Sequence, residues 1–397
     1  MNLWAISDSI SLDFKLEDRG DTQLSGSLAY NRIVVKAGTN VLTGGGDSLN
    51  EEVIASLVRQ IASVRGLGAE VLIVSSGAIA AGVNILGVGR QGNDVPFRQV
   101  LAAIGQSRLM HVYEKLFEPH EIIVAQALLS RGDITDREGY LNVRNTLLSL
   151  IELKVVPIIN ENDVVAVEEI GQDVFGDNDS LSALVANLVD ADLLVMLSDI
   201  DGLHTSDPHQ DPSAELIPVV EKVDGAIESL AGSSHSIKSR GGMRAKLEAA
   251  KLATASGVSV ALANGMVADV VSRLVAGESV GTFFLPTSSK MESRKRWMLS
   301  GLSNRGLIVV DNGAAEAIRA GNRSLLPAGV SSVDGEFQRG DIVLVVDQQG
   351  GKIACGISSY AASDVIVIKG LRSDAIYKVL GHQYGQEILH RNNMVLL

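Results

Sequence analysis

Lysine and serine side chains stand where two short apolar runs of this sequence end. Lys36 closes IVVK and leads into the small-residue segment AGTNVLTGGG, whose backbone amides could approach phosphate oxygens closely. Ser76 closes VLIVSS before a predicted helix, and a helix N-terminus can bind a carboxylate or a phosphate. A solvated lysine and a simple N-cap are the ordinary alternatives. Neither stretch alone decides between an anion site and these alternatives.

Two Asn/Asp clusters carry a more specific signal. PIINENDVVA closes a predicted strand and contains Asp163, and GDNDSLSALVANLV opens a predicted helix with Asn178 and Asp179. Carboxylates and amides grouped in this way suit an ammonium group or a metal-nucleotide, and free amides at the helix start suit a carboxylate. Each cluster alone could be an Asx-rich turn with a good cap. Together, at adjacent strand ends, they favour a site for an amino acid.

Two later segments suit a second anion. Ser198 and Asp199 end the buried run LLVMLSD, and KSRGGMRAKLEAAKLA predicts a glycine loop that leads into a helix with Lys246 in its first turns. A lysine there opposes the helix dipole, so a bound anion would explain it. The Walker pattern GxxxxGK[ST] is absent, and GVGRQG and GESVG lack the strand context that their motifs require. A nucleotide site would therefore be of another kind.

Composition limits the classes of partner. The chain has 47 Asp plus Glu against 34 Lys plus Arg, so its net charge draws it neither to nucleic acid nor to an anionic membrane. One cysteine, Cys355, excludes a disulfide framework, and no Cys/His cluster has zinc-finger spacing. Residues 1–30 lack the uninterrupted apolar block expected of a signal peptide, and no run approaches roughly 20 apolar residues. We expect a cytoplasmic protein without membrane or nucleic-acid partners.

The elements that must position these side chains form an α/β pattern. Between residues 31 and 285, apolar runs alternate with helical patterns, which predicts a mainly parallel sheet sandwiched by helices. Ligands bind beyond the carboxyl ends of the strands in such sheets. The helix after the first strand is expected to begin with a capping box of Ser48 and Glu51. The strands are expected at 32–36, 70–74, 121–125, 154–159, 192–197 and 257–262.

The two ends of the chain differ from this pattern. Residues 1–30 are expected to be a flexible N-terminal extension. Residues 286–304 are predicted to be a linker, because polar and basic residues interrupt the apolar pattern and helical periodicity fades. Residues 305–397 are expected to form a small β-rich domain whose strands are LIVV, DIVLVVD, KIACGISSY and DVIVIKG.

Seven motifs in order resemble the glutamate 5-kinases of the amino acid kinase family: VVKAGTNVLTGG, VSSGAIAAG, LAAIGQSRLM, PIINENDVVA, GDNDSLSALVA, SDIDGLHTSDP and GGMRAK. The resemblance covers about residues 31–390, and the C-terminal module resembles the PUA domain of bacterial members. It implies phosphorylation of the γ-carboxylate of L-glutamate by ATP and Mg²⁺, the first step of proline biosynthesis. It also implies inhibition by proline, a homodimer or homotetramer, and handover of the product to glutamyl phosphate reductase.

The same resemblance implies residue roles. Lys36 and Lys246 would neutralise the transferring phosphoryl group, and Asp179 would organise the reacting groups. Glutamate would be bound by Ser76, Asp163 and Asn178. ATP would contact Lys36, Ser198, Asp199, Arg240, Gly241, Gly242, Met243, Arg244, Ala245 and Lys246, and Mg²⁺ is expected through the ATP phosphates rather than through protein ligands. Relatives usually have threonine at the positions of Arg240 and Ala245, so the details of the ATP loop depart from the family pattern. The additional residues GQDVF between the two Asn/Asp clusters would alter the response to glutamate or to proline.

Two alternatives stay open. Another kinase of the family would act on N-acetylglutamate, aspartate, carbamate or UMP, but NEND together with GDND and the PUA-like tail argue against it. An RNA-binding protein would act through the PUA-like module. That module has nine basic and nine acidic side chains from Arg305 onward, a poor electrostatic match for a polyanion.

Overall fold

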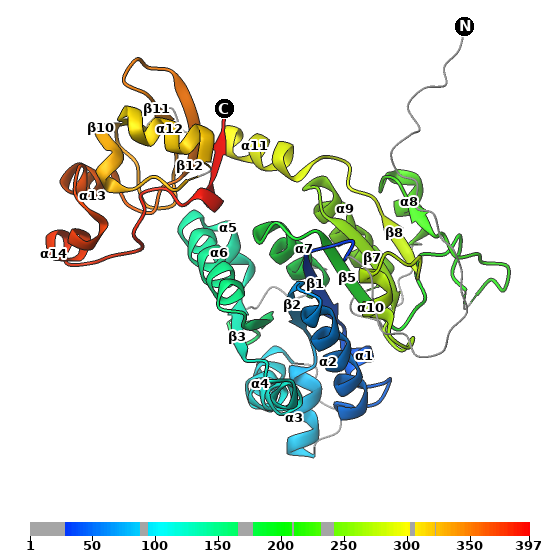
Figure 1. Ribbon diagram of the computed structural model, residues 1–397. Coiled ribbons are helices and arrows are strands. Elements are labelled where there is room, and N and C mark those ends of the chain that lie inside the picture. Colours follow the sequence, from blue (N-terminus) through cyan, green and yellow to red (C-terminus); the bar gives the residue numbers. More distant parts are fainter. Residues whose placement is uncertain are drawn as a thin grey trace, which may run out of the picture.

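The computed structural model describes residues 28–87, 94–165, 178–208, 210–231, 242–301, 306–321 and 323–397. Its strands form two separate sheets, of eight and five strands (Figure 1). The strands of the larger sheet are β1 (Arg32–Ala37), β2 (Glu70–Ser75), β3 (Val124–Leu129), β4 (Val156–Glu161), β5 (Leu193–Ser198), β6 (Val219–Val220), β7 (Ser259–Asn264) and β8 (Thr282–Phe284). Their order is β3-β4-β2-β1-β5-β7-β8-β6, and the pairs are parallel except β7 with β8. The expected mainly parallel sheet is confirmed.

Helices cover both faces of this sheet, because side chains alternate between the faces along each strand. Ile33 and Val35 of β1 pack with α2, α4 and α10 on one face, whereas Val34 packs with α6, α7 and α9 on the other. The helices are α1 (Thr39–Leu42), α2 (Glu51–Gly66), α3 (Ala78–Leu86), α4 (Val95–Phe117), α5 (Arg131–Thr135), α6 (Arg137–Glu152), α7 (Asn178–Leu188), α8 (Gly225–Leu230), α9 (Met243–Ala255) and α10 (Val270–Val275).

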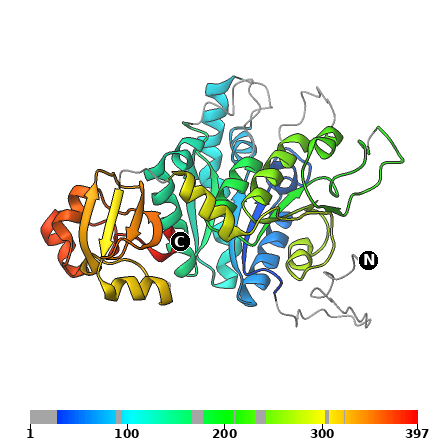
Figure 2. The ribbon, with the colours of Figure 1, turned by 90° about the horizontal axis from the view of Figure 1, so that it is seen from above.

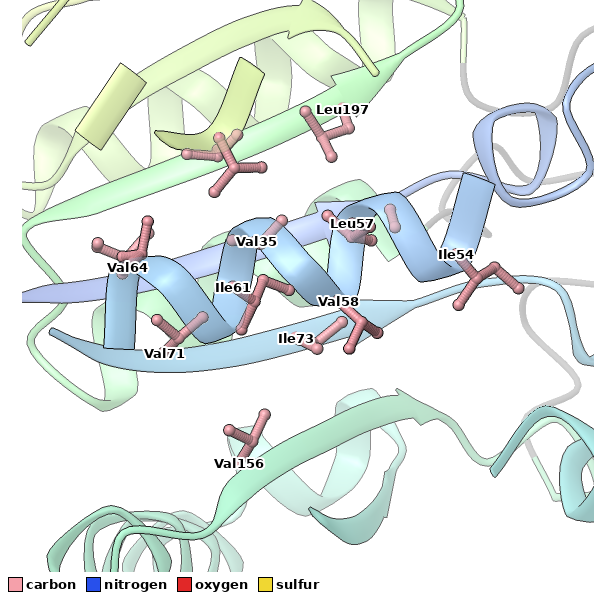
Figure 3. Packing of buried hydrophobic residues seen from close by; sticks show 14 of the residues in the cluster. Val35, Ile54, Leu57, Val58, Ile61, Val64, Val71, Ile73, Val156 and Leu197 are labelled. Atoms are coloured by element: carbon pink, nitrogen blue, oxygen red, sulfur yellow. The ribbon is translucent and has the colours of Figure 1, made fainter. Parts of the chain in front are cut away.

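Helix α2 shows why the sequence folds in this way. Its apolar residues recur every three or four positions, so one stripe faces the sheet. Figure 3 shows that stripe lying on β1 and β2, with Ile54, Leu57, Val58, Ile61 and Val64 packed over Val35, Val71 and Ile73. Each such buried side chain contributes roughly 1.5–3 kcal/mol. The stripe therefore fixes α2 across the strands whose carboxyl ends carry Lys36 and Ser76.

Five predicted strands agree with the structure to within two residues, and two local predictions are wrong. Strand β3 begins at Val124 instead of 121, because a 3₁₀ turn (Glu118–His120) follows α4 and Glu121 adopts a left-handed conformation with φ 56°. The expected capping box of Ser48 and Glu51 does not form. Asn50 caps α2 instead, and its side chain accepts from the backbone amides of Glu52 and Val53.

The smaller sheet has the order β10-β9-β11-β12-β13 and lies to one side of the larger sheet in both views (Figure 2). DVIVIKG, expected to be a strand, is mostly the helix α13. Val365 and Ile368 are buried three positions apart, whereas Ile366 and Val367 are about half exposed, which is a helical pattern. The elements are β9 (Gly306–Val310), α12 (Asn312–Gly321), β10 (Val330–Gly335), β11 (Ile342–Val346), β12 (Lys352–Ile357), α13 (Ala362–Ile368), α14 (Ile376–Leu380) and β13 (Met394–Leu396).

Much of the predicted linker is a helix, α11 (Lys290–Gly301). Its Met298 is buried among Leu141 of α6 and Ile342, Cys355 and Val395 of the smaller sheet. The domain limits at 286 and 304 stay a prediction.

Arg144 of α6 connects the part of the chain that holds the larger sheet to the C-terminal segment that ends in the smaller sheet. Its side chain is only 3% exposed. Its Nε donates to Asn393 Oδ1 at 2.9 Å. Its Nη2 donates to Asp190 Oδ2 at 2.6 Å and to the Asn392 carbonyl at 2.7 Å, and its Nη1 donates to the Leu188 carbonyl. One guanidinium thus ties α6, the end of α7 and the C-terminal segment together. No helix in the described ranges is long and apolar enough to cross a membrane.

Candidate active site at the carboxyl ends of the strands

The sheet order brings the predicted site residues side by side. Strands β4, β2, β1 and β5 are consecutive neighbours, and each carries a predicted site residue at or just after its carboxyl end. These residues are Asp163 after β4, Ser76 after β2, Lys36 in β1 and Ser198 in β5. The chain crosses from β1 to β2 on one side and β5 pairs with β1 on the other, so β1 lies at a topological switch point.

Lys36, Asp179 and Lys246 form a buried ionic cluster. Lys36 Nζ lies 2.6 Å from Asp179 Oδ1, and Lys246 Nζ lies 3.1 Å from Asp179 Oδ2. The three side chains are 3%, 0% and 8% exposed. Their formal charges sum to +1, and ammonium groups held in fixed positions are strong donors to an anion. The cluster is therefore suited to binding an anion.

Three elements meet to build this cluster. Lys36 lies two positions after Val34 in β1, so its side chain projects to the same face, where α7 and α9 pack. Asp179 is the second residue of α7, and Lys246 is the fourth residue of α9. The unfavourable position of Lys246 near a helix N-terminus is offset by the Asp179 carboxylate.

A chain of hydrogen bonds lies beside the cluster. Asn178 Nδ2 donates to Ser76 Oγ at 2.8 Å and to Asn160 Oδ1 at 3.1 Å, and Asn160 Nδ2 donates to Gln106 Oε1 at 2.8 Å. Ser76 is not the N-cap of α3, because Gly77, with φ 101°, has that position. Among the described residues, Asn178 Oδ1 and Gln106 Nε2 are buried and have no partner. The hydrogen-bond chain thus contains two buried polar atoms to which a bound ligand could hydrogen-bond.

Close contact between α3 and α4 brings Gln106 to this chain. A Cβ on Gly105 would lie 1.8 Å from the Ala78 carbonyl oxygen, and one on Gly82 would lie 2.0 Å from the Leu101 carbonyl oxygen. Any side chain at either position would force the helices apart. Glycine therefore allows the backbone contact that holds α4 over the start of α3.

Asp163 occupies the loop after β4, apart from the hydrogen-bond chain. Burial raises its pKa to about 6, and the charge of Arg98 at the start of α4 opposes this increase. Gln99 of the same helix turn donates to the Val164 carbonyl at 3.0 Å, so α4 also holds this loop. No hydrogen bond between Asp163 and Ser76 or Asn178 is found within the described residues.

Ser198 and Asp199 form a second polar group at the end of β5. Asp199 accepts from Asn40 Nδ2 at 2.8 Å and from Ser198 Oγ at 3.1 Å. Burial alone would raise the pKa of Asp199, but these hydrogen bonds, one from its own backbone and the charge of Lys246 together lower it. The carboxylate therefore stays ionised below its ordinary range.

The glycine loop before α9 is described only in part. Gly242 is the N-cap of α9, Met243 is half-buried against the core, and Ala245 is half-buried. Arg244 is exposed and pairs with Glu248 of the same helix. Arg240 and Gly241 lie outside the described residues.

The glycine run after β1 does not offer its amides to a ligand. The amides of Gly44, Gly45 and Gly46 donate to the carbonyls of Val41, Asn40 and Thr43 and close the turn before α2. Within the segment AGTNVLTGGG, whose amides were expected to approach phosphate oxygens, these three amides are therefore already used by the turn. Gly38 remains next to the site, where a Cβ would lie 3.4 Å from Lys36 Nζ.

Sequence reasoning missed three residues of the site. Asn160 lies within the quoted PIINENDVVA and Gln106 within LAAIGQSRLM, but neither was singled out. Asn40, which binds Asp199, stands in the segment after Lys36. A side-chain amide leaves no periodic signal in the sequence, so only the fold reveals these partners.

Comparisons with known proteins agree with this geometry. The model of the "Amino acid kinase family" matches residues 31–264, and the "PUA domain" model matches residues 306–380. A "Glutamate 5-kinase" of Dehalococcoides mccartyi strain CBDB1 is 52% identical over 93% of this chain and 99% of its own. One from Herpetosiphon aurantiacus is 51% identical over 92% of this chain and 98% of its own. The chain belongs to the amino acid kinase family.

Proposed function

We propose that this protein transfers the γ-phosphoryl group of ATP to the γ-carboxylate of L-glutamate, which gives L-glutamyl 5-phosphate and ADP. The observation that carries the proposal is the buried cluster of Lys36, Asp179 and Lys246 beside the Ser76–Asn178 pair. A net positive site next to amide and hydroxyl groups suits a phosphoryl group beside an amino acid. The relatives named glutamate 5-kinase share about half of their residues with this chain over almost its full length.

The reaction needs no general base. A glutamate side chain has an ordinary pKa of about 4.3, so the attacking carboxylate is already ionised at neutral pH. The main barrier is the approach of two anions, a carboxylate and a triphosphate. Positioning and electrostatic stabilisation lower such a barrier.

The two lysines would supply that stabilisation. Asp179 holds both ammonium groups within 3.1 Å of its carboxylate oxygens, so their positions are fixed before substrates bind. Preorganised charges need no rearrangement when negative charge moves to the bridging oxygen of the leaving ADP. Asp179 is itself acceptor-only and thus orients the lysines rather than the substrates.

Mg²⁺ would be held by the ATP phosphates. The deeply buried carboxylate of the site, Asp179, already pairs with two lysines, so its oxygens are poorly suited to a cation. Within the described ranges, no group of three or more His, Cys, Asp or Glu side chains could hold a metal ion. When bound, Mg²⁺ would neutralise charge on the phosphates.

The strand order suggests where each substrate binds. Glutamate would lie over β4 and β2, near Ser76, Asp163 and Asn178, and the transferring phosphoryl group over β1. The nucleotide would lie over β5 and the start of α9. Its partners would be Ser198, Asp199 and residues 240–246, with Lys36 and Lys246 at the phosphates.

The biological setting is part of the same proposal and rests on the family resemblance. The reaction would be the first step of proline biosynthesis in the cytoplasm, with inhibition by proline. The protein would form a homodimer or homotetramer and pass its unstable acyl phosphate to glutamyl phosphate reductase. We assign the PUA domain a structural or regulatory role, because α6 and α11 pack directly against it.

The test is ATP- and Mg²⁺-dependent formation of γ-glutamyl hydroxamate from L-glutamate and hydroxylamine. Aspartate and N-acetylglutamate serve as parallel substrates, because kinases acting on them share the fold. We expect a signal with L-glutamate alone. A preference for another acid would reject the substrate assignment and leave the family membership intact.

A further inference from the structure

The hydrogen-bond chain that begins at Gln106 runs in one direction in this structure. Gln106 Oε1 accepts from Asn160 Nδ2 at 2.8 Å, so the nitrogen end of the Asn160 amide faces Gln106. The oxygen end of that amide then faces Asn178 and accepts from its Nδ2 at 3.1 Å. Asn160 is 2% exposed, so water cannot easily replace either bond.

The direction determines what Asn178 offers a ligand. The two N–H groups of its amide donate to Asn160 Oδ1 and to Ser76 Oγ, so none remains. Asn178 Oδ1 is buried and has no partner among the residues that the structure describes. A buried acceptor almost always has a donor, and an ammonium group is the strongest donor that a small substrate can bring.

We infer that Gln106 is a positioning residue for recognition of the substrate amino group. It fixes the orientation of Asn160 and, through Asn160, turns the oxygen of Asn178 toward the ammonium group. This inference rests on the proposed function and deepens it, because it assigns the residue that sets the preference for an α-amino acid. A reversed Asn178 amide would present N–H groups to the ammonium and repel it.

The local fold fits this role. Gln106 follows Gly105, whose lack of a side chain lets α4 contact the backbone of α3. The next residue, Ser107, is exposed, and within the described residues its hydroxyl donates only to the Ile104 carbonyl of its own helix. Gln106 thus reaches the chain from a rigid helix crossing. Its Nε2 is also buried, and the experiment must separate orientation from direct contact by this nitrogen.

Two substitutions make that separation. Gln106→Met has a similar size and removes the acceptor for Asn160, whereas Gln106→Glu keeps an acceptor and lacks the Nε2 donor. We expect Gln106→Met to raise the KM for L-glutamate about tenfold, the scale of one lost hydrogen bond to a charged group, with kcat changed less than twofold. Gln106→Glu should keep KM within about threefold of the unchanged enzyme.

A larger rise in KM for Gln106→Glu than for Gln106→Met would overturn the inference. If Gln106 only fills space, methionine is the milder change and a buried glutamate the more harmful one. If Nε2 contacts the substrate directly, both variants lose affinity equally. Ser107→Ala, one position along α4, is the matched control and should leave KM unchanged.

Glutarate separates the amino group from the rest of the substrate. Its inhibition constant against L-glutamate should change less than twofold in Gln106→Met, because glutarate has no ammonium group. An equal tenfold loss for both compounds would refute the link from Gln106 to the ammonium. Failure of the unchanged enzyme to phosphorylate glutamate would instead reject the proposed function.

Discussion

Replacement of Lys246 by methionine tests how the site handles charge. Methionine retains the length of the apolar stem but removes the ammonium group, so the formal charge of the Lys36, Asp179 and Lys246 cluster falls from +1 to 0. Two unit charges about 4 Å apart at an effective dielectric constant of about 20 interact by about 4 kcal/mol. Loss of one preorganised group of this kind lowers kcat about 10²–10³-fold.

The fold should survive this substitution. Asp179 keeps Lys36 at 2.6 Å, so its buried carboxylate is still paired. The loss should appear mainly in kcat, because negative charge builds up on the leaving oxygen in the transition state. We expect a melting temperature within a few degrees of the unchanged protein. The hydroxamate assay gives kcat and differential scanning calorimetry gives the melting temperature.

Lys251 provides the matched control. It lies on the same helix, its side chain is 56% exposed, and it pairs with Glu228. Lys251→Met should keep kcat within twofold, because exposed ion pairs contribute little. More than a tenth of the normal kcat in Lys246→Met, or an equal loss in Lys251→Met, would refute the electrostatic role.

Three further predictions follow from single contacts. Burial raises the pKa of Asp163 to about 6, so between pH 3.8, the ordinary value, and pH 6 the folded protein binds more protons than the unfolded chain, and its stability falls as the pH rises. Asp163→Asn should therefore raise the melting temperature at about pH 7.5 and also raise the KM for glutamate. An unchanged melting temperature would contradict this prediction. Arg144→Ala should lower the free energy of unfolding, measured with urea, by about 3–5 kcal/mol, because it leaves buried polar partners such as Asn393 unsatisfied. A decrease below about 1 kcal/mol would show that these contacts contribute little to stability. Gly105→Ala should lower the free energy of unfolding by about 1–3 kcal/mol or more, because the new Cβ would lie 1.8 Å from a backbone oxygen. Gly132→Ala is the control and should leave stability unchanged, because its Cβ would lie 3.6 Å from the nearest atom. Equal stabilities of the two variants would disprove the contact.

Apolar periodicity predicted the larger sheet well and the smaller one less well. Strand β5 is buried at every position and apolar up to its last residue, Ser198, so both its type and its limits stand out in the sequence. DVIVIKG has the β-branched composition of a strand, yet it folds as α13, because packing of Val365 and Ile368 against one core overrides local preference. Asn50 replaced the expected Ser48 cap because either residue type can cap a helix, and only the helix start decides between them.

The candidate site shows a similar limit. Lys36, Ser76 and Ser198 follow from strand ends, since the fold brings parallel carboxyl ends to one edge. The pairing of Lys36 and Lys246 on one carboxylate joins residues far apart in the chain, and no spacing rule could give it. Gln106 was invisible for the same reason, since its partner Asn160 lies on another element.

The junction at Arg144 also has a consequence for synthesis on the ribosome. Two of its partners, Leu188 and Asp190, emerge only 44 and 46 residues later, but Asn393 is 249 residues away. At a translation rate of about 5–20 residues per second, Asn393 is synthesised roughly 12–50 s after Arg144. Over this time the larger sheet can fold, while the surface of α6 that will receive the smaller sheet stays open. The nascent chain is therefore open to misassembly or chaperone binding at this helix until the C-terminal segment is synthesised.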